Sequence, residues 1–340
     1  MPVPVTTKDV ARKAGVSQAT VSRVLNNHHY VNEETRQKVL KAIKELGYQP
    51  NIIARSMALQ KTHALGLMVS DLTNPFYSEL AKSIINRAKE LGYNVIIYNT
   101  DTEDVQATYL DFLQQRRVDG IIFTSVELKD SKVEKLVKAG FPCVFCNRRL
   151  KLKTSSFICS DNKKGAKIAV KHLINLGHKH IGYISGPNNY STALERLEGY
   201  IETVREHGLH VDNQLIKQGY FNNDYAYSAT RELISIPNPP TAIFVSNDLM
   251  ALAAMEAVLD AGLRVPEDIA LVGYDDIKIS GHKLIQLTTV AQHMETMGRL
   301  AVDELVQMLS RDGGRQKPVH KFLEPELIIR ETCGYRLAKK

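Results

Sequence analysis

Residues 6–48 constrain the fold of this 340-residue chain more than any other segment. Their apolar side chains recur at helical spacing, and small residues interrupt the pattern where helices are expected to begin and end. Thr7 is expected to cap a first short helix, Gly15 to provide a tight turn, and Ser17 to cap a second helix. A third helix is expected to start after Asn32. Two short helices joined by such a turn are typical of the helix-turn-helix motif, whose second helix enters the major groove of DNA.

The outer side of the second helix carries groups that suit DNA. They are short polar, methyl-bearing or bidentate side chains, which can contact base edges and phosphates. The positive charge gathers in the same region, because residues 1–62 hold ten Lys and Arg against four Asp and Glu, and the remainder holds 34 against 33. A basic head on a neutral body is the electrostatic pattern of a nucleic-acid-binding protein. The outward side chains of this helix are Gln18, Ala19, Ser22 and Arg23.

The rest of the chain, from His63 onward, alternates short β-branched runs with helical stretches. Near-continuous apolar strands interleaved with helices predict parallel sheets that are covered on both faces. Two successive runs of this kind indicate two doubly wound lobes, with the second opening near Asp161. The expected fold is therefore an all-α head plus an α/β body of two doubly wound parallel-sheet lobes. Strands are expected at 64–69, 93–98, 118–124, 142–146, 157–159, 181–185, 242–245 and 269–272, and helices at 75–91, 105–116, 163–176, 193–207 and 249–261.

Polar and aromatic side chains gather where the expected strands end. Sheets of this type bind ligands at the carboxyl ends of their strands. Carboxylates, guanidinium groups and amides around aromatic rings suit a polyhydroxylated ligand, because they bind hydroxyls while the rings cover sugar C–H faces. The alternative for each aspartate is a helix cap, which is common directly after a strand. The candidate effector-binding residues are Asp71, Phe76, Arg148, Asp161, Arg196, Asp248, Asp275 and Gln292.

The four cysteines and the apolar runs exclude several classes of protein. Cys143 and Cys146 lie three apart on an expected strand, so they point to opposite faces and cannot share a metal ion. Core thiols are the expectation for these and for Cys159 and Cys333, and neither a metal nor a cofactor is expected. No run approaches the length of a membrane span and no apolar leader follows the first methionine. A cytoplasmic protein with no membrane partner is expected.

Several segments together resemble the lactose-repressor (LacI/GalR) family of bacterial transcription regulators. The resemblance covers nearly the whole chain and implies a body similar to periplasmic sugar-binding proteins, with three crossings between lobes. It divides the chain into a head at 1–50, a hinge helix at 51–62 and a body at 63–340. Lobe 1 would span about 63–161 plus 292–325, and lobe 2 about 162–291. The segments that carry it are VARKAGVSQATVSRVLN at 10–26, YQPNIIARSMA at 48–58, SDNKKGA at 160–166, HLINLGH at 172–178, ERLEGY at 195–200, SNDLMA at 246–251 and GYDD at 273–276.

The resemblance implies how the head and hinge bind DNA. In that family the segment after Asn51 folds on the operator, pairs with its twin in the dimer and pushes an apolar side chain into the minor groove. Met57 stands where the family usually has leucine, and Ala58 where it frequently has lysine. The candidate DNA-binding residues are Thr7, Ser17, Gln18, Ala19, Thr20, Ser22, Arg23, Asn26, Asn51, Ala54, Arg55 and Met57.

The resemblance also implies a function. The expectation is a homodimeric repressor that binds a pseudo-palindromic operator in double-stranded DNA and responds to a small effector, which is a sugar, sugar acid or sugar phosphate. By motif position, Arg196, Asp248 and Asp275 carry over as effector contacts. A phosphorylated carrier protein as co-regulator is an alternative within the same family.

A sugar-processing enzyme is the alternative of a different class. Paired carboxylates from Asp71, Asp161, Asp248 and Asp275 would be needed for glycoside hydrolysis. The sequence has no G-x-S-x-G elbow, H-E-x-x-H helix, Walker-type phosphate loop or dinucleotide G-x-G-x-x-G motif. We therefore expect no enzymatic activity.

Overall fold

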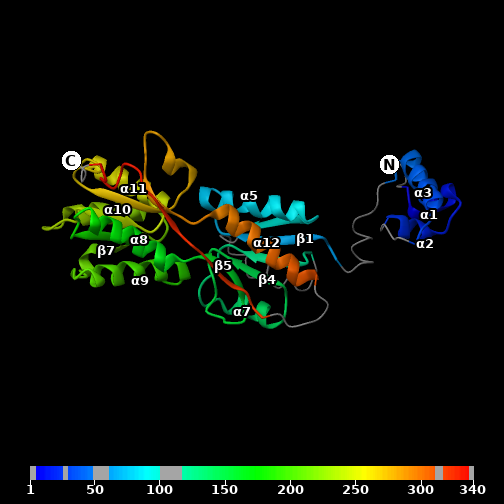
Figure 1. The fold of residues 1–340 in the computed structure, drawn as a ribbon, viewed down its shortest axis with the longest axis horizontal. Helices are drawn as coiled ribbons and strands as arrows, with labels where there is room; N and C mark the ends of the chain where they lie inside the picture. The colour runs from blue at the N-terminus through cyan, green and yellow to red at the C-terminus, as the bar shows by residue number, and fades with distance from the viewer. Residues whose placement is uncertain (1–4, 26–29, 49–60, 100–116, 311–316, 337–340) are drawn as a thin grey trace. The chain divides into compact units, whose positions relative to one another are not determined.

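The computed structural model describes residues 5–25, 30–48, 61–99, 117–310 and 317–336 (Figure 1). The chain forms two compact units, Met1–Thr62 and His63–Lys340, which are described separately below. None of the described helices combines the length and the apolar character that a membrane crossing requires.

The described residues of the first unit form three short helices, and the start of the first differs from the expectation. Helix α1 (Thr7–Ala14) is capped by Thr6, whose backbone is extended and whose hydroxyl accepts from the backbone N–H of Asp9. The Asp9 carboxylate accepts in return from the N–H of Thr6 at 3.0 Å, which completes a capping box. The prediction that Thr7 caps this helix is wrong, because Thr7 already has helical geometry and cannot turn its hydroxyl back to the free N–H groups.

The following two helices begin where the sequence predicts. Gly15 ends α1 in the left-handed region at φ 66°, a conformation that side chains with a Cβ rarely adopt. The Ser17 hydroxyl accepts from the N–H of Thr20 at 3.1 Å, so Ser17 caps α2 (Gln18–Leu25). Asn32 caps α3 (Glu33–Leu46) in the same way. One apolar cluster joins the three helices, and its buried members are Val10, Ala11, Val21, Val24, Val39, Ala42 and Tyr48.

The described strands of the second unit form two six-stranded sheets with equivalent strand orders. The first sheet has the order β11-β5-β4-β3-β1-β2 and all its strands are parallel. Without β11, the remaining five strands have the doubly wound order 2-1-3-4-5. Sheets with this order bind ligands where the strand order reverses. The strands are β1 (Ala64–Val69), β2 (Asn94–Asn99), β3 (Gly120–Phe123), β4 (Cys143–Cys146), β5 (Ser156–Ser160) and β11 (His320–Leu323).

The second sheet has the order β12-β10-β9-β8-β6-β7, and only β12 is antiparallel to its neighbour. It is therefore the counterpart of the first sheet, strand by strand. Among the described strands, the chain passes between the sheets after β5, after β10 and after β11. The strands are β6 (Ile181–Ser185), β7 (Ile216–Gln218), β8 (Ala242–Val245), β9 (Ala270–Asp275), β10 (Thr288–Ala291) and β12 (Glu326–Ile328).

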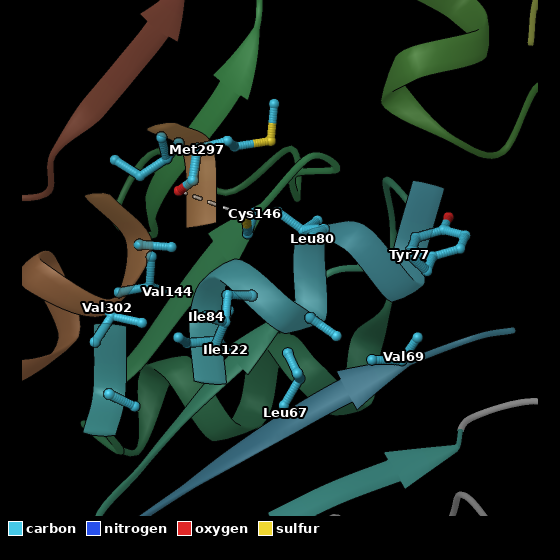
Figure 2. Close-up of a cluster of buried hydrophobic side chains, with 14 of the residues drawn as sticks. Leu67, Val69, Tyr77, Leu80, Ile84, Ile122, Val144, Cys146, Met297 and Val302 are labelled. Atoms are coloured by element: carbon cyan, nitrogen blue, oxygen red, sulfur yellow. Dashed lines mark hydrogen bonds between the residues drawn. The ribbon is translucent and has the colours of Figure 1, made fainter. Parts of the chain in front are cut away.

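Helices cover both faces of the sheets and bury the apolar strands. In the first lobe α5 (Pro75–Glu90) and α12 (Met294–Ser310) lie side by side on one face (Figure 1), and α7 (Ser131–Lys138) contributes to the other. Figure 2 shows side chains of α5, α12, β1, β3 and β4 meeting in the first of these cores. In the second lobe α8 (Asn162–Asn175) and α9 (Ser191–Glu206) cover one face, and α10 (Asn223–Ser235) and α11 (Asp248–Asp260) cover the other.

The cysteines lie in these cores, as predicted. All four are buried and unpaired. Cys146 packs in the cluster with α5 and α12, and Cys143 in the cluster on the opposite face of the same sheet. Burial raises the pKa of both thiols well above its ordinary value. Within the described part of the chain, no group of three or more His, Cys, Asp or Glu residues could hold a metal ion.

Candidate functional site

The outer side of α2 carries the side chains that the sequence assigns to DNA. Gln18, Ala19, Ser22 and Arg23 are exposed on the helix, while Val21 and Val24 on its inner side are buried. Because α2 packs into the head through its two valines, the other four side chains are presented together on one surface. They are the groups that a recognition helix turns toward the major groove.

The remaining candidates of the head have other positions. Thr7 and Thr20 are half-buried, and the hydroxyls of Ser17 and Thr20 lie 2.9 Å apart at the start of α2. Ser17 thus caps the recognition helix α2, and its side chain is exposed at the N-terminus of that helix. The other candidates lie outside the described residues, and they are Asn26, Asn51, Ala54, Arg55 and Met57.

Replacing Arg23 by alanine is expected to weaken specific binding by about 1–3 kcal/mol if its guanidinium group reads a guanine. Binding to cognate and scrambled duplexes at two salt concentrations measures this. If Arg23 contacts only a phosphate, both duplexes weaken alike and the salt slope becomes shallower by about one. Arg12→Ala is the matched control, because Arg12 is an exposed arginine of the same head on α1. An affinity that Arg23→Ala leaves unchanged on both duplexes would remove Arg23 from the interface.

The second unit contains a cavity of about 270 Å³ at the carboxyl ends of both sheets. Residues that follow β1 and β4 of the first lobe line it, and so do residues that follow β6, β7, β8 and β10 of the second lobe. The cavity therefore lies where two doubly wound sheets are expected to bind a ligand, with a wall from each lobe.

Arg196 of α9 is held in the cavity wall by buried partners. Only 3% of its side chain is exposed, and its Nε donates to Oδ1 of Asn162 at 2.9 Å. Its Nη1 donates to the backbone carbonyl of Ser246, and its guanidinium carbon lies 3.7 Å from the centre of the Tyr274 ring. These contacts fix the guanidinium plane, so Arg196 is preorganised rather than free to reorient when a ligand enters.

Asp275 at the end of β9 is the acidic partner of Arg196. Its Oδ1 lies 3.8 Å from Nη1 of Arg196 and accepts from Nε2 of Gln292 at 2.6 Å. Burial raises the pKa of Asp275 above its ordinary value, although the nearby Arg196 lowers it. The backbone of Asp275 has φ 125°, a strained value for a residue with a side chain. Oε1 of Gln292 is buried without a hydrogen-bond partner, so the wall keeps an unused acceptor.

Arg148 follows β4 and carries the other guanidinium group of the cavity. It is 7% exposed, and its Nη1 donates to the Ser125 hydroxyl at 2.8 Å. Its guanidinium carbon lies 3.7 Å from the ring centre of Tyr190 and 5.2 Å from that of Phe221. Both rings belong to the second lobe, so they hold a cation of the first lobe by cation–π contact.

Six of the eight predicted effector residues line the cavity, and two do not. Asp161 instead caps α8, because its Oδ1 accepts from the N–H of Lys164 at 3.0 Å. Asp248 is fully buried behind the wall, where burial raises its pKa. Its carboxylate accepts from the N–H of Ile277 at 3.0 Å and from two hydroxyls, of Ser280 at 2.7 Å and of Thr289 at 2.5 Å. The residues that do line the cavity as predicted are Asp71, Phe76, Arg148, Arg196, Asp275 and Gln292.

Several lining residues are not among the candidate effector-binding residues. Asn247 directly precedes the candidate Asp248, so the end of β8 was the correct signal for this part of the wall. Tyr220 and Phe221 follow β7, a strand of three half-buried residues that is too short to predict from its pattern. The other lining residues outside the candidate set are Ser70, Asn74, Tyr77, Asn147, Pro187, Tyr190 and Thr192.

A helix-turn-helix head joined to two sheet lobes with a polar cavity between them defines a ligand-responsive DNA-binding regulator. Residues 6–51 match the model of bacterial regulatory proteins of the lacI family, and residues 170–333 match a periplasmic binding protein-like domain. The chain belongs to the lacI family of bacterial regulatory proteins.

Individual relatives agree with this assignment over almost their full length. The transcriptional repressor PurR of Photobacterium profundum is 36% identical over 96% of this chain and 98% of its own. The ribose operon repressor of Escherichia coli (strain K12) is 37% identical over 96% of this chain and 99% of its own. A solved lac repressor dimer, bound to operator and the anti-inducer ONPF, is 32% identical with a TM-score of 0.86 and covers 97% of this chain and 99% of its own.

The family membership confirms the fold class and the functional class that the sequence predicts. The chain is a DNA-binding transcription regulator and not an enzyme. The aspartates proposed for the hydrolase alternative also have other tasks, since Asp161 caps a helix and Asp248 is saturated by internal donors.

Proposed function

We propose that this chain is a homodimeric repressor of an inverted-repeat operator, and that a small polyhydroxylated molecule in the cavity sets its affinity for DNA. The cavity is the observation that carries the second part. It combines buried charges of both signs with the side-chain amides of Asn147, Asn247 and Gln292. Such groups donate to and accept from hydroxyls, so a ligand with several hydroxyls fits this lining.

The effector would act by holding the two lobes together. Three contacts already join the region around β3 and β4 to the second lobe. Nη2 of Arg149 donates to Oε1 of Glu195 at 2.7 Å, and the N–H of Arg149 donates to the Ser191 hydroxyl at 3.1 Å. The N–H of Leu128 donates to the carbonyl of Asn189 at 2.7 Å. A ligand that touches both walls favours this closed arrangement over an open one, and the difference in its affinity for the two sets the size of the response.

The proposed division of the chain follows from this mechanism. The helix-turn-helix head spans 1–50, a hinge helix or linker spans 51–62, and the effector-binding body spans 63–340. Lobe 1 comprises about 63–161 with 292–325, and lobe 2 about 162–291. In the dimer, a change in lobe closure alters the separation of the two hinges and so folds or melts them on DNA. Met57 would be the apolar wedge of the hinge.

A phosphorylated carrier protein is the alternative source of control. Measuring operator affinity separates this alternative from a small effector, because a small effector changes that affinity with no second protein present. If only a phosphorylated protein changes that affinity, the cavity is secondary.

Selection of duplexes from a random pool by gel shift tests the DNA-binding proposal. Two identical heads related by a two-fold axis require two half-sites in inverted orientation. We expect the selected sequences to contain such an inverted repeat. Recovery of asymmetric sequences alone would contradict the dimer on a two-fold operator.

A further inference from the structure

We propose that the effector is an anion, and that Arg148 binds its carboxylate or phosphate group. This inference rests on the proposed function, in which the cavity is the effector site. It narrows that site from polyhydroxylated molecules in general to sugar derivatives that carry a negative charge.

The first observation is that Arg148 is a buried cation without an acidic partner. Within the described residues, no carboxylate lies within the 4.0 Å of an ion pair with it. Its Nη1 has only the neutral Ser125 hydroxyl, and its Nε is buried with no acceptor. Arg148 contributes to lowering the pKa of Asp275, but the two side chains do not form an ion pair. A buried charge without a counter-charge is strongly unfavourable, so such a residue indicates that a ligand supplies the anion.

Three other arginines of the same region have acidic partners, unlike Arg148. Arg149, the next residue, pairs with Glu195 at 2.7 Å, and Arg196 has Asp275 at 3.8 Å. Arg330 pairs with Asp276 at 2.7 Å. The fold therefore provides acidic partners for its partly buried guanidinium groups around the cavity, and Arg148 is the lining arginine that is left for the ligand.

The second observation is the aromatic surround of Arg148. The guanidinium carbon lies 3.7 Å from the Tyr190 ring centre, 5.2 Å from that of Phe221 and 5.9 Å from that of Tyr77. An aromatic ring that lies over the planar cation does not use its N–H groups as donors. The N–H groups that no protein acceptor uses match the oxygens of a carboxylate or phosphate. Because Tyr77 belongs to the first lobe and the other two rings to the second, an anion held here also stabilises the closed lobes.

The rest of the cavity suits the remainder of such a molecule. Asn247, Asp275 and Gln292 offer donors and acceptors for hydroxyls, and Phe76 offers an apolar surface. The cavity of about 270 Å³ has room for a small polar molecule.

Calorimetry on the full chain with a matched series of probes tests the proposal. The carboxylate probes are D-galacturonate, D-glucuronate and D-gluconate, the phosphate probes are ribose 5-phosphate and glucose 6-phosphate, and the neutral probes are galactose, glucose and ribose. We expect at least one anion to bind and its neutral counterpart to bind at least about tenfold more weakly. Binding of the carboxylate probes or of the phosphate probes shows which of the two acidic groups the cavity recognises.

Arg148→Met then assigns the effect to this residue. We expect it to weaken the anion about tenfold to a hundredfold while changing the binding of neutral sugars little. Arg205→Met is the matched control, because Arg205 is exposed on α9 and does not line the cavity. Without ligand, removal of an uncompensated buried cation is expected to leave the thermal midpoint of Arg148→Met unchanged or raised. This readout needs no effector, and a lowered midpoint would count against an unpaired cation.

The outcomes separate this inference from the proposed function. A neutral sugar that binds as tightly as its acid would overturn the anion proposal and leave the cavity as the effector site. If neither anionic nor neutral probes bind while operator binding is normal, the anion proposal and the assignment of the cavity both fail. Anion binding that Arg148→Met does not change would place the charge recognition on another residue.

Discussion

Asp248→Ala is expected to lower the free energy of unfolding of the body by about 3 kcal/mol or more. The carboxylate is fully buried and accepts from the N–H of Ile277 and from the hydroxyls of Ser280 and Thr289. Alanine leaves these three donors in the core without an acceptor, and each unsatisfied buried group costs about 1–3 kcal/mol. Recovery of the desolvation penalty of the carboxylate offsets part of the loss. Urea denaturation followed by circular dichroism measures the difference.

Asp161→Ala is the matched control for this substitution. Asp161 follows a strand, as Asp248 does, and both are candidate effector-binding residues. The loss of Asp161 removes only one capping hydrogen bond from α8. A helix cap is worth about 1 kcal/mol. Equal losses for the two variants would show that Asp248 is no more than a cap.

The pH dependence of stability gives a second test of the buried carboxylate. Burial raises the pKa of Asp248 in the folded protein, so between its unfolded and folded pKa values the folded state binds more protons. The contribution of this group to stability is therefore lost as the pH rises through the folded pKa, which lies above the ordinary value near 4. Asp248→Asn is expected to remove that part of the pH dependence.

Asp275→Ala is expected to weaken effector binding by about 1.5–3 kcal/mol, which is about tenfold to a hundredfold, while operator binding without effector is unchanged. Asp275 lines the cavity, so its carboxyl group can bond to a ligand hydroxyl, and alanine removes that bond. The DNA-contacting head is a separate compact unit, so the substitution does not alter its surface. Calorimetry with the effector and a gel shift without it measure the two effects.

Asp268→Ala is the control for loss of a negative charge in the same lobe, because Asp268 forms an exposed ion pair with Arg264. We prefer Asp275 to Arg196 for this test because Arg196→Ala would also remove buried bonds to Asn162 and Ser246. Unchanged effector affinity in Asp275→Ala, with normal circular dichroism, would show that control enters elsewhere.

The pH dependence of effector affinity follows from the same residue. Burial raises the pKa of Asp275, so the neutral acid persists above the ordinary range of an aspartate. A bound anion raises this pKa further, because it repels the ionised carboxylate. The affinity for an anionic effector is therefore expected to fall as the pH rises through the pKa of Asp275, and Asp275→Asn is expected to flatten that fall.

Much of the fold follows from local pattern. Strands β1, β6 and β8 have the predicted bounds, and α3 begins after Asn32 as expected, because apolar runs and caps mark them locally. Elements that depend on pairing with distant strands were missed. β11 pairs with β5 and β12 with β10, but both strands are short and none of their residues is fully buried, so no apolar run marks them in the sequence. The helices α7, α10 and α12 were also missed, and the helix expected at 105–116 lies outside the described residues.

The sequence by itself determined the two kinds of unit, the family and the strand ends where polar residues gather. Those properties depend on local periodicity, capping and charge, which are readable along the chain. Only the tertiary structure decided which polar side chains face the cavity. Asn247 and Asp248 follow the same strand, yet Asn247 lines the cavity and Asp248 accepts three internal hydrogen bonds behind it. Arg148 and Arg149 are adjacent, but only Arg149 meets an acidic partner, because Glu195 comes from a helix of the other lobe. The direction of a side chain and the identity of its partner depend on elements far away in sequence, and no local pattern encodes them.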